Sequence, residues 1–309
     1  AVASRSATKA QQIGEREGCR WATDYGELLA SPDVEIVCIT TSSGSHYGIA
    51  KEALEAGKHV LVEKPIAMRA EEADHLVDLA WRKRLTLSVV SQRRFEPQLM
   101  HVKRAIDAGK LGRLLLVEAS TPFYRTQAYY DSAAWRGTRE EDGGALMNQG
   151  IHQIDLLLWY GGPVRTVYGK IATFTHQIEA EDMGVAIVHF TSGALGTIMA
   201  STSTQPGFPP RIHLFGEKGT VKIEGNQVVF WNVPDAEEPP RETAGKGGGE
   251  SDPLAFSHVY HKLQIEDFLR AVAEGADPIV TGIDGRRAVA VVNGIYESSL
   301  TGKEIALRD

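Results

Sequence analysis

The chain has 309 residues, of which 42% are hydrophobic and 24% are charged, an ordinary composition for a soluble globular protein. Its length predicts two domains, each large enough to bury a core. The net charge of -7 argues against nucleic acid or an anionic membrane as the main partner. The longest apolar runs are far shorter than the roughly 20 residues that a bilayer requires.

The two cysteines lie in different contexts, Cys19 in a polar stretch and Cys38 inside the apolar run EIVCIT. This pattern indicates neither a disulfide framework nor a metal cluster. A reducing, cytoplasmic setting is therefore expected, and no metal site is predicted.

Residues 1–95 alternate short apolar runs with helical patterns. The sequence AVAS at the start resembles the end of a strand, and a helix is expected at 6–17. Further strands are predicted at 35–40, 59–62 and 85–95, and further helices at 46–57 and 69–84. Apolar strands that alternate with helices predict a parallel sheet covered on both faces, which is half of a doubly wound, Rossmann-type α/β domain.

Residues 96–309 have a different pattern. A helix at 97–112 precedes a strand at 114–121, and several strand-like runs follow, joined by the turn signals TSG, GEKG and EGNQ. These runs predict an α+β domain with a large, open, mostly antiparallel sheet. One helical pattern interrupts it at 145–161, and a last helix is expected at 285–302. The segment 233–253, rich in Pro, Gly and charge, is expected to be a mobile surface loop.

Polar residues follow the predicted parallel strands at 40–46, 63–65 and 91–95. Because ligands of such sheets bind at the carboxyl ends of the strands, these residues should share one site. Lys64 is the most informative of them, since a lysine at the end of a buried strand costs desolvation. Burial would lower its pKa and suit it to proton transfer. The alternative is a surface lysine whose stem packs on the core while its ammonium reaches water.

The helical segment 142–159 carries polar residues in an apolar helix. His152 and Asp155 are three residues apart and share one face, with Asn148 one turn earlier. A lone histidine in an apolar helix is more often structural than catalytic, so both interpretations stay open. A single His-x-x-Asp pair is also a weak metal signal, because two more ligands are needed.

The segment 123–138 is dense in Tyr, Trp and Arg without a regular period. Such residues suit a polyhydroxylated or phosphorylated ligand. Simple packing of the aromatic rings on the sheet explains the composition equally well.

The ordered set of motifs resembles the glucose-fructose oxidoreductase, inositol dehydrogenase and MocA-like family of NAD(P)-dependent oxidoreductases. The motifs are EKP at 63–65, YYDSAAWRGT at 129–138, GGALMNQGIHQIDLLLW at 143–159 and the terminal helix. The resemblance covers nearly the whole chain and implies a Rossmann domain, residues 1–95, followed by a substrate-binding and oligomerisation domain, residues 96–309.

The resemblance also implies roles for individual residues. Lys64 would contact cofactor and substrate hydroxyl, and His152 would be the acid/base. Many members have an aspartate four residues before that histidine, where this chain has Asn148, which cannot take a proton. Asn148, Asp155, Tyr124 and Arg125 are expected to contact substrate. The expected cofactor contacts are Ser4, Arg5, Thr40, Thr41, Ser42, His46, Glu63, Lys64, Pro65, Gln92, Trp135 and Arg136.

The sequence departs from the family at its beginning, where no Gly-x-Gly-x-x-Gly motif occurs. About one strand and one helix, roughly 30 residues of the nucleotide fold, are expected to precede it. Ser4 and Arg5 then stand where NAD enzymes carry an acid for the ribose. Arg5 could accept a 2′-phosphate, which tilts the expectation from NAD toward NADP. A solvated arginine at a helix start is the alternative.

The expected function is NAD(P)-dependent interconversion of a secondary alcohol and a ketone on a sugar, cyclitol or nucleotide sugar. An NAD-dependent glycoside hydrolase and a non-catalytic nucleotide- or sugar-binding regulator of the same fold are the alternatives. A sugar-like small molecule is the expected partner, with no nucleic acid and no membrane. A homodimer or homotetramer through the C-terminal sheet is also expected.

Overall fold

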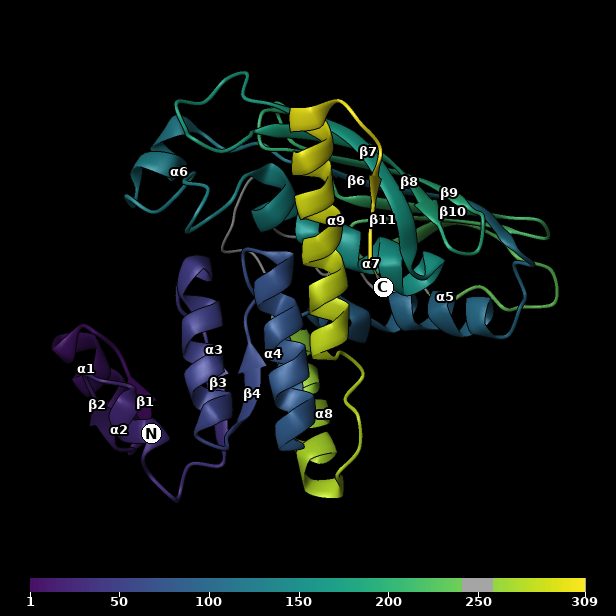
Figure 1. Cartoon of the computed structure of the whole chain (residues 1–309). Helices are drawn as coiled ribbons and strands as arrows, with labels where there is room; N and C mark the ends of the chain where they lie inside the picture. The colour runs from purple at the N-terminus through teal and green to yellow at the C-terminus, as the bar shows by residue number, and fades with distance from the viewer. Residues whose placement is uncertain (241–257, 309) are drawn as a thin grey trace.

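The computed structural model describes residues 1–240 and 258–308. A small, layered α/β region that contains the N-terminus lies beside a large sheet with helices on one side (Figure 1). The long helix α9, Gly282–Thr301, runs along both regions, since it packs on α4 of the first and on β7 of the second. The Rossmann-type region followed by a large sheet was predicted from the sequence and is confirmed.

The first region contains three parallel strands in the order β3, β4, β5, at Ile36–Ile39, His59–Val62 and Leu87–Val89. Helices α3, His46–Glu55, and α4, Ala70–Lys83, connect them. Alternate residues of β4 are buried on opposite faces, because Val60 and Val62 pack in the main core while Leu61 packs against Phe268. Helices therefore cover both faces, as expected of a parallel sheet.

The N-terminal segment forms a separate pair of parallel strands, β1 at Val2–Ala3 and β2 at Trp21–Ala22. Between them lies α1, Ala7–Glu17, whose N-cap Ser6 accepts a hydrogen bond from the Lys9 amide. The expected end of a strand and the following helix are both present. A short helix, α2 at Gly26–Leu29, leads on to β3.

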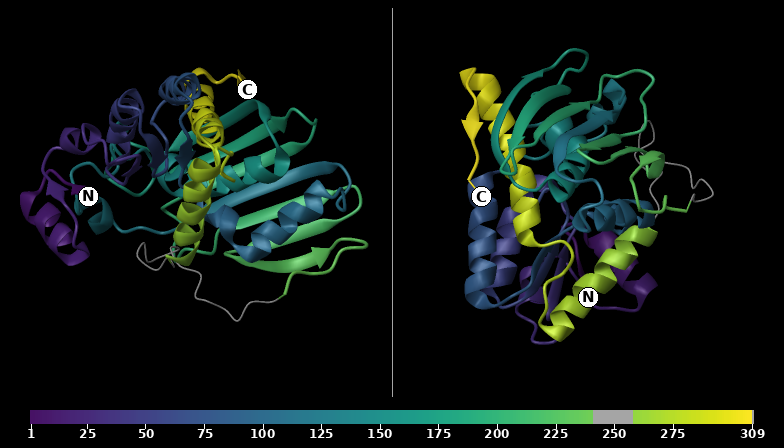
Figure 2. Two further views of the ribbon diagram at one scale, coloured as in Figure 1. Left: turned by 90° about the horizontal axis from the view of Figure 1, so that it is seen from below. Right: turned by 90° about the vertical axis from the view of Figure 1, so that its right-hand side faces the viewer.

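The large sheet has eight strands in the order β12-β11-β10-β6-β9-β8-β7-β13. Within the described residues of this eight-stranded sheet, only the β6–β9 pair is parallel, so the sheet is mostly antiparallel as predicted. Figure 2 shows the strands side by side with helices on one face. The strands are β6 Leu114–Pro122, β7 Val164–Ala172, β8 Met183–Phe190, β9 Leu195–Ser201, β10 Arg211–Gly216, β11 Thr220–Glu224, β12 Gln227–Asn232 and β13 Ile305–Ala306.

The helical pattern expected at 145–161 is divided into two parts. A π-helical segment, η3 at Ala145–Gly150, passes directly into α7, Ile151–Gly161. Most of α7 is buried between the sheet and α9, including Ile154, Leu156 and Leu157. Short π-type segments often occur at functional sites, and this one carries Asn148. The remaining short elements are η1 Ser43–Ser45, η2 Gln92–Phe95, α5 Pro97–Asp107 and α6 Gln127–Asp131.

No element was predicted from the sequence at residues 254–281, yet the structure has helix α8 at Val259–Glu274. The buried face of α8 is narrow and centres on Gln264, which donates to Val89 O at 2.8 Å and accepts from the Ser91 amide at 2.9 Å. Because a polar residue fills this core position, the helical period of apolar residues is weak. α8 packs on the parallel sheet, so the division at residue 95 stays a prediction.

Of the expected loop at 233–253, residues 241–253 lie outside the described part of the chain. Within residues 1–240 and 258–308, no helix combines the length and apolarity needed to cross a membrane.

Candidate active site

Polar residues follow the three parallel strands and meet at one edge of the sheet, as predicted. His46, 1% exposed, connects two strand ends: its Nδ1 lies 2.7 Å from Pro65 O and its Nε2 lies 3.1 Å from Thr41 O. Burial lowers the pKa of His46, against the effect of these two carbonyls. A neutral ring has a single N–H and therefore donates to only one of these two carbonyls.

Lys64 is partly buried and points to the π-helical segment of the second region. Its ammonium donates to the backbone oxygen of Asn148 at 2.9 Å and to Asn148 Oδ1 at 3.0 Å. The Lys64–Pro65 peptide bond is cis. Burial lowers the pKa of Lys64; the charges of Glu63 and Asp142 oppose this shift, and that of Arg136 adds to it. Lys64 is therefore held by hydrogen bonds rather than reaching freely into water.

His152 is the second residue of α7 and lies four residues after Asn148. Burial lowers its pKa well below the ordinary 6.5, and the positive charges of Lys64, Arg93 and His261 add to the shift. Within the described residues no hydrogen bond to the His152 ring is found. The structure thus brings Lys64, Asn148 and His152 together, and a neutral imidazole there can accept a proton.

A buried acid that the sequence analysis missed lies behind Asn148. Asp142 is 1% exposed; its carboxylate accepts the Gly137 amide at 2.8 Å and the side-chain amide of Asn148. Burial raises the pKa of Asp142, against the effects of the Gly137 N–H, Lys64 and Arg136. Its position before two glycines in the histidine motif was the available signal.

The glycines after Asp142 are required by the local geometry. Gly143 has a φ of 70°, which favours glycine. A Cβ on Gly144 would lie 2.1 Å from the Glu181 carboxyl group. Asp142, Gly143 and Gly144 therefore form one turn that sets where the π-helical segment starts.

Asp155 belongs to a separate ionic cluster. Its carboxylate accepts from Arg94 through both oxygens, at 2.6 and 2.9 Å, and Arg94 also reaches Asp284 at 3.1 Å. Asp155 is 4% exposed, and this bidentate pair joins α7 to η2, while the Arg94–Asp284 contact joins η2 to α9. The structure therefore shows Asp155 engaged with Arg94, and its expected substrate contact stays a prediction.

The aromatic segment 123–138 forms stacked layers rather than an irregular loop. The Arg136 guanidinium lies over Tyr129 at 4.2 Å and over Trp135 at 4.5 Å, and donates to the Tyr129 hydroxyl at 2.6 Å. Arg125 lies over Phe123 at 5.3 Å and over Tyr129 at 5.5 Å. Burial lowers the pKa of Arg125. Tyr129 thus joins the two arginines expected to contact substrate and cofactor.

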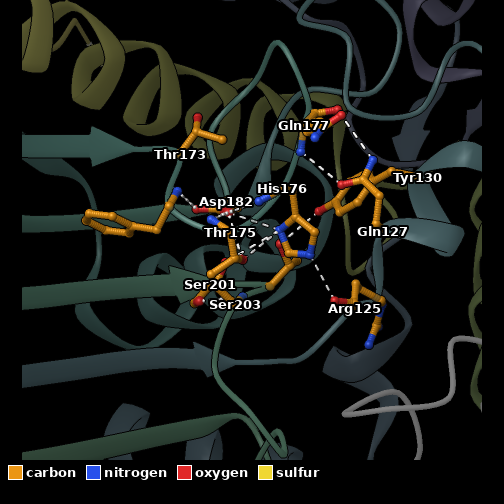
Figure 3. Close-up of polar contacts among 12 residues, drawn as sticks. Arg125, Gln127, Tyr130, Thr173, Thr175, His176, Gln177, Asp182, Ser201 and Ser203 are labelled. Carbon is orange, nitrogen blue, oxygen red and sulfur yellow. Dashed lines mark hydrogen bonds and ion pairs between the residues drawn. The ribbon is translucent and has the colours of Figure 1, made fainter.

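A second buried cluster holds this segment to the sheet (Figure 3). His176 Nδ1 lies 3.0 Å from Asp182 Oδ2, and its Nε2 lies 2.9 Å from Arg125 O. His176 thus connects Asp182 to the backbone of residue 125. Tyr124 pairs with Ser203 through an isolated β-bridge at the same place. His176 and Asp182 were not predicted from the sequence, since no spacing connects them to residue 125.

The remaining predicted cofactor residues follow the strand ends. Ser42 Oγ donates to Glu141 at 2.8 Å, Thr41 accepts from Ser45 Oγ at 2.7 Å, and Thr40 is exposed. Ser4 follows β1 and its amide donates to Ala22 O at 3.1 Å, while Arg5 is exposed. These positions lie at strand ends, and their cofactor contacts stay predictions.

The residues at the sheet edge fit a polar dinucleotide. Gln92 is 8% exposed, yet its Oε1 has no hydrogen-bond partner among the described residues. Hydroxyls at 40–42, the Gln92 amide and the Trp135–Arg136 stack offer donors, acceptors and a flat cationic surface, which a nicotinamide dinucleotide requires. No group of three or more His, Cys, Asp or Glu side chains in the described ranges is arranged to hold a metal ion.

Comparison with known proteins agrees with the fold. Residues 1–91 match the model of an oxidoreductase family with an NAD-binding Rossmann fold, and residues 99–222 match that of the GFO/IDH/MocA C-terminal domain. An uncharacterised oxidoreductase of Schizosaccharomyces pombe is 30% identical over 93% of this chain and 85% of its own length. The chain belongs to the GFO/IDH/MocA family of oxidoreductases.

Two further relatives have more specific names. The NAD(+)-dependent scyllo-inositol 2-dehydrogenase of Bacillus subtilis is 26% identical over 89% of this chain and 79% of its own length. The structure of the WlbA dehydrogenase from Bordetella pertussis, in complex with NADH and UDP-GlcNAcA, aligns with a TM-score of 0.87 at 32% identity. That alignment covers 99% of this chain and 89% of the WlbA chain.

Proposed function

We propose that this oxidoreductase interconverts a secondary alcohol and a ketone on a sugar, cyclitol or nucleotide sugar. The observation that carries the proposal is the meeting of Lys64, Asn148 and His152, from two separate regions of the chain, at the polar edge of the parallel sheet. A regulator would need only the binding surface, whereas this arrangement keeps a proton acceptor next to a constrained ammonium group.

Two groups of the chain would carry the proton chemistry. In the oxidative direction the substrate hydroxyl donates its proton to the neutral His152 ring, while a Lys64 N–H holds the same oxygen. In the reductive direction His152 returns the proton to the carbonyl oxygen. A bound nicotinamide would supply or accept the hydride, held by the residues at the strand ends and by Trp135 and Arg136. Asn148 only orients Lys64, since an amide does not take a proton.

We infer that the substrate is most similar to a nucleotide sugar. Support comes from the WlbA complex, which contains UDP-GlcNAcA, and from the cationic character of the 123–138 segment. Arg125 and Arg136 are planar donors that suit phosphate or carboxylate groups, and Tyr124 lies next to Arg125. We propose NADP or NAD as the cofactor, since relatives of both kinds exist, and Arg5 favours NADP.

We also propose a homodimer or homotetramer through the large sheet, in the cytoplasm. The exposed large residues on neighbouring strands are Tyr168 on β7, Val185 and Ile187 on β8 and Leu195 on β9. An apolar patch of this kind on a sheet face is typical of an interface between copies of a protein. Sedimentation would test it, with Ile187→Glu expected to shift the protein to monomer.

The experiment that tests the function has two stages. NADH and NADPH are first titrated by fluorescence, and Arg5→Ala is expected to weaken NADPH binding more than NADH binding. Turnover is then followed by nicotinamide absorbance with UDP-sugars, free sugars and inositols. Cofactor-linked oxidation of any of them supports the proposal. Release of reducing sugar without an absorbance change would instead indicate a glycoside hydrolase. Ligand binding without turnover on the whole panel would indicate a regulator.

A further inference from the structure

Asp142 is a buried acid that the proposed reaction does not use. Its side chain lies at the turn before the π-helical segment and accepts two hydrogen bonds, from Gly137 N and from Asn148 Nδ2. Its carboxylate faces the same amide that contacts Lys64. A buried carboxylate requires such donors, but only one of them leads to the candidate active site.

The two neighbours of Asn148 fix the orientation of its amide. The NH₂ group donates to the Asp142 carboxylate, and Oδ1 accepts from Lys64 Nζ at 3.0 Å. A carboxylate only accepts and an ammonium only donates. A reversed amide would place oxygen against oxygen and NH₂ against the ammonium, so Asp142 and Lys64 together permit one orientation.

This orientation in turn determines how Lys64 is used. An ammonium has three N–H donors, and the two oxygens of Asn148 take two of them. For the third N–H, the described residues provide no acceptor. The substrate oxygen would therefore meet one defined N–H rather than a freely rotating ammonium, which is an advantage for positioning.

We infer that Asp142 is a positioning residue that acts through Asn148 to present a single Lys64 N–H to the substrate oxygen. The inference rests on the proposed function for the role of that N–H. The negative charge of Asp142 acts in the same direction, because it opposes the lowering of the Lys64 pKa by burial and by Arg136. Removing the charge should lower the pKa of Lys64 further.

The test compares Asp142→Asn with a charge exchange, Asp142→Asn combined with Asn148→Asp. The exchange restores one carboxylate and one amide, with the carboxylate now next to Lys64. The reaction of Lys64 with an uncharged acylating reagent, followed by peptide mass spectrometry across pH, reports its titration, because only the neutral amine reacts. The midpoint of this titration is the pH at which Lys64 is half protonated, and Asp142→Asn is expected to lower it by about one pH unit. The exchange should return the midpoint to the original value or above it.

Turnover provides the second measurement. Asp142→Asn should lower kcat by about tenfold or more with a small change in KM, and the exchange should recover part of the loss. Asp182→Asn is the matched control, since Asp182 is an equally buried acid that accepts backbone amides but does not face Lys64. It should reduce stability and leave the Lys64 midpoint unchanged.

An unchanged Lys64 midpoint in Asp142→Asn, with lower stability only, would overturn the inference and make Asp142 a structural residue. If Asp142→Asn does not fold, a Lys64 midpoint in the exchange variant below that of the unmodified protein would overturn it instead. The titration does not depend on turnover. Absence of any cofactor-linked reaction would therefore reject the proposed function separately, while the midpoints still decide whether Asp142 controls Lys64.

Discussion

Two buried aspartates of this protein, Asp182 and Asp142, have pKa values shifted in opposite directions from the ordinary value. Asp182 accepts from the amides of Phe174, Thr175 and His176 and from the His176 ring. Although burial alone raises its pKa, these donors hold the pKa of Asp182 at about 2. Asp142 accepts one backbone amide and one side-chain amide, and burial keeps its pKa raised.

The difference indicates what each cluster does. Asp182 accepts from several donors, and the His176 ring next to it also contacts the carbonyl of Arg125. The Asp182 cluster therefore fixes the position of the 123–138 segment. Asp142 accepts from fewer donors. It orients the side-chain amide of Asn148, which in turn holds the Lys64 ammonium and leaves one of its N–H groups for the substrate. A fully satisfied network stabilises structure, whereas a partly satisfied one next to an open site can act on a ligand.

The largest effect on turnover is expected from substitutions of Lys64 and His152, the two residues proposed to contact the substrate oxygen. Lys64→Met and His152→Ala should each lower kcat by about 10²–10⁴, because each removes a group that handles the proton or the oxygen of the substrate. Nicotinamide absorbance with the best substrate of the panel measures this. The melting temperature of each variant should stay close to that of the parent.

Arg139→Gln serves as the control for this first prediction, because Arg139 is exposed and contributes a backbone amide rather than its side chain to Glu179. It should retain nearly full activity. Full activity in both Lys64→Met and His152→Ala would remove these residues from the mechanism.

A smaller effect, on stability rather than rate, is expected from Asp182→Asn. The variant loses the negative charge between four N–H donors, which should reduce the free energy of unfolding by about 3 kcal/mol. Urea denaturation followed by fluorescence measures it. A loss below about 0.5 kcal/mol would contradict the interpretation of this cluster as an anchor.

The pH dependence of the same variant sharpens the comparison. The pKa of Asp182 is about 2 in the folded protein and 3.8 ordinarily, so its contribution to stability is present above pH 3.8 and is lost as the pH falls toward 2. Asp182→Asn should lack this part of the acid transition. A parallel loss of stability in variant and parent between about pH 4 and pH 2 would contradict the assigned pKa.

The sequence allowed the fold to be predicted further than the site. Strand periods, helix caps and turn signals are local, so β3, β4, β5 and the hairpins of the large sheet were recognised from single segments. Helix α8 was missed because Gln264 occupies its core position. Lys64 and His152 were identified because each lies in a short motif of its own.

The partners of these residues could not be predicted, because they depend on tertiary contacts. Lys64 and Asn148 are 84 residues apart, and Arg125 and His176 are 51 residues apart. Asp155 is a further example: its helical spacing from His152 is real, but the spacing did not predict that Arg94 takes both carboxylate oxygens. The expected substrate contact of Asp155 stays a prediction.

The smallest expected effect concerns Glu181, the neighbour of Asp182 in the chain. Burial raises the pKa of Glu181 to about 7, although the Leu146 amide and the Tyr296 hydroxyl donate to it. An acid whose pKa is raised on folding costs stability as the pH rises from its ordinary 4.5 through 7. The free energy of unfolding of Glu181→Gln, relative to the parent, should therefore increase by about 2 kcal/mol between about pH 5 and pH 8.

Urea denaturation at several pH values measures this, and Glu179→Gln is the control because Glu179 is exposed. The control should keep a constant difference from the parent over the same range. The effect of Glu181 is thus opposite in sign to that of Asp182 one residue later. The reason is that two donors reach the Glu181 carboxylate, whereas the loop at 174–176 surrounds Asp182. If the free energy of unfolding of Glu181→Gln differed from that of the parent by the same amount at every pH, burial would not dominate the pKa of Glu181. The number of hydrogen-bond donors would then not indicate which buried acids stay neutral.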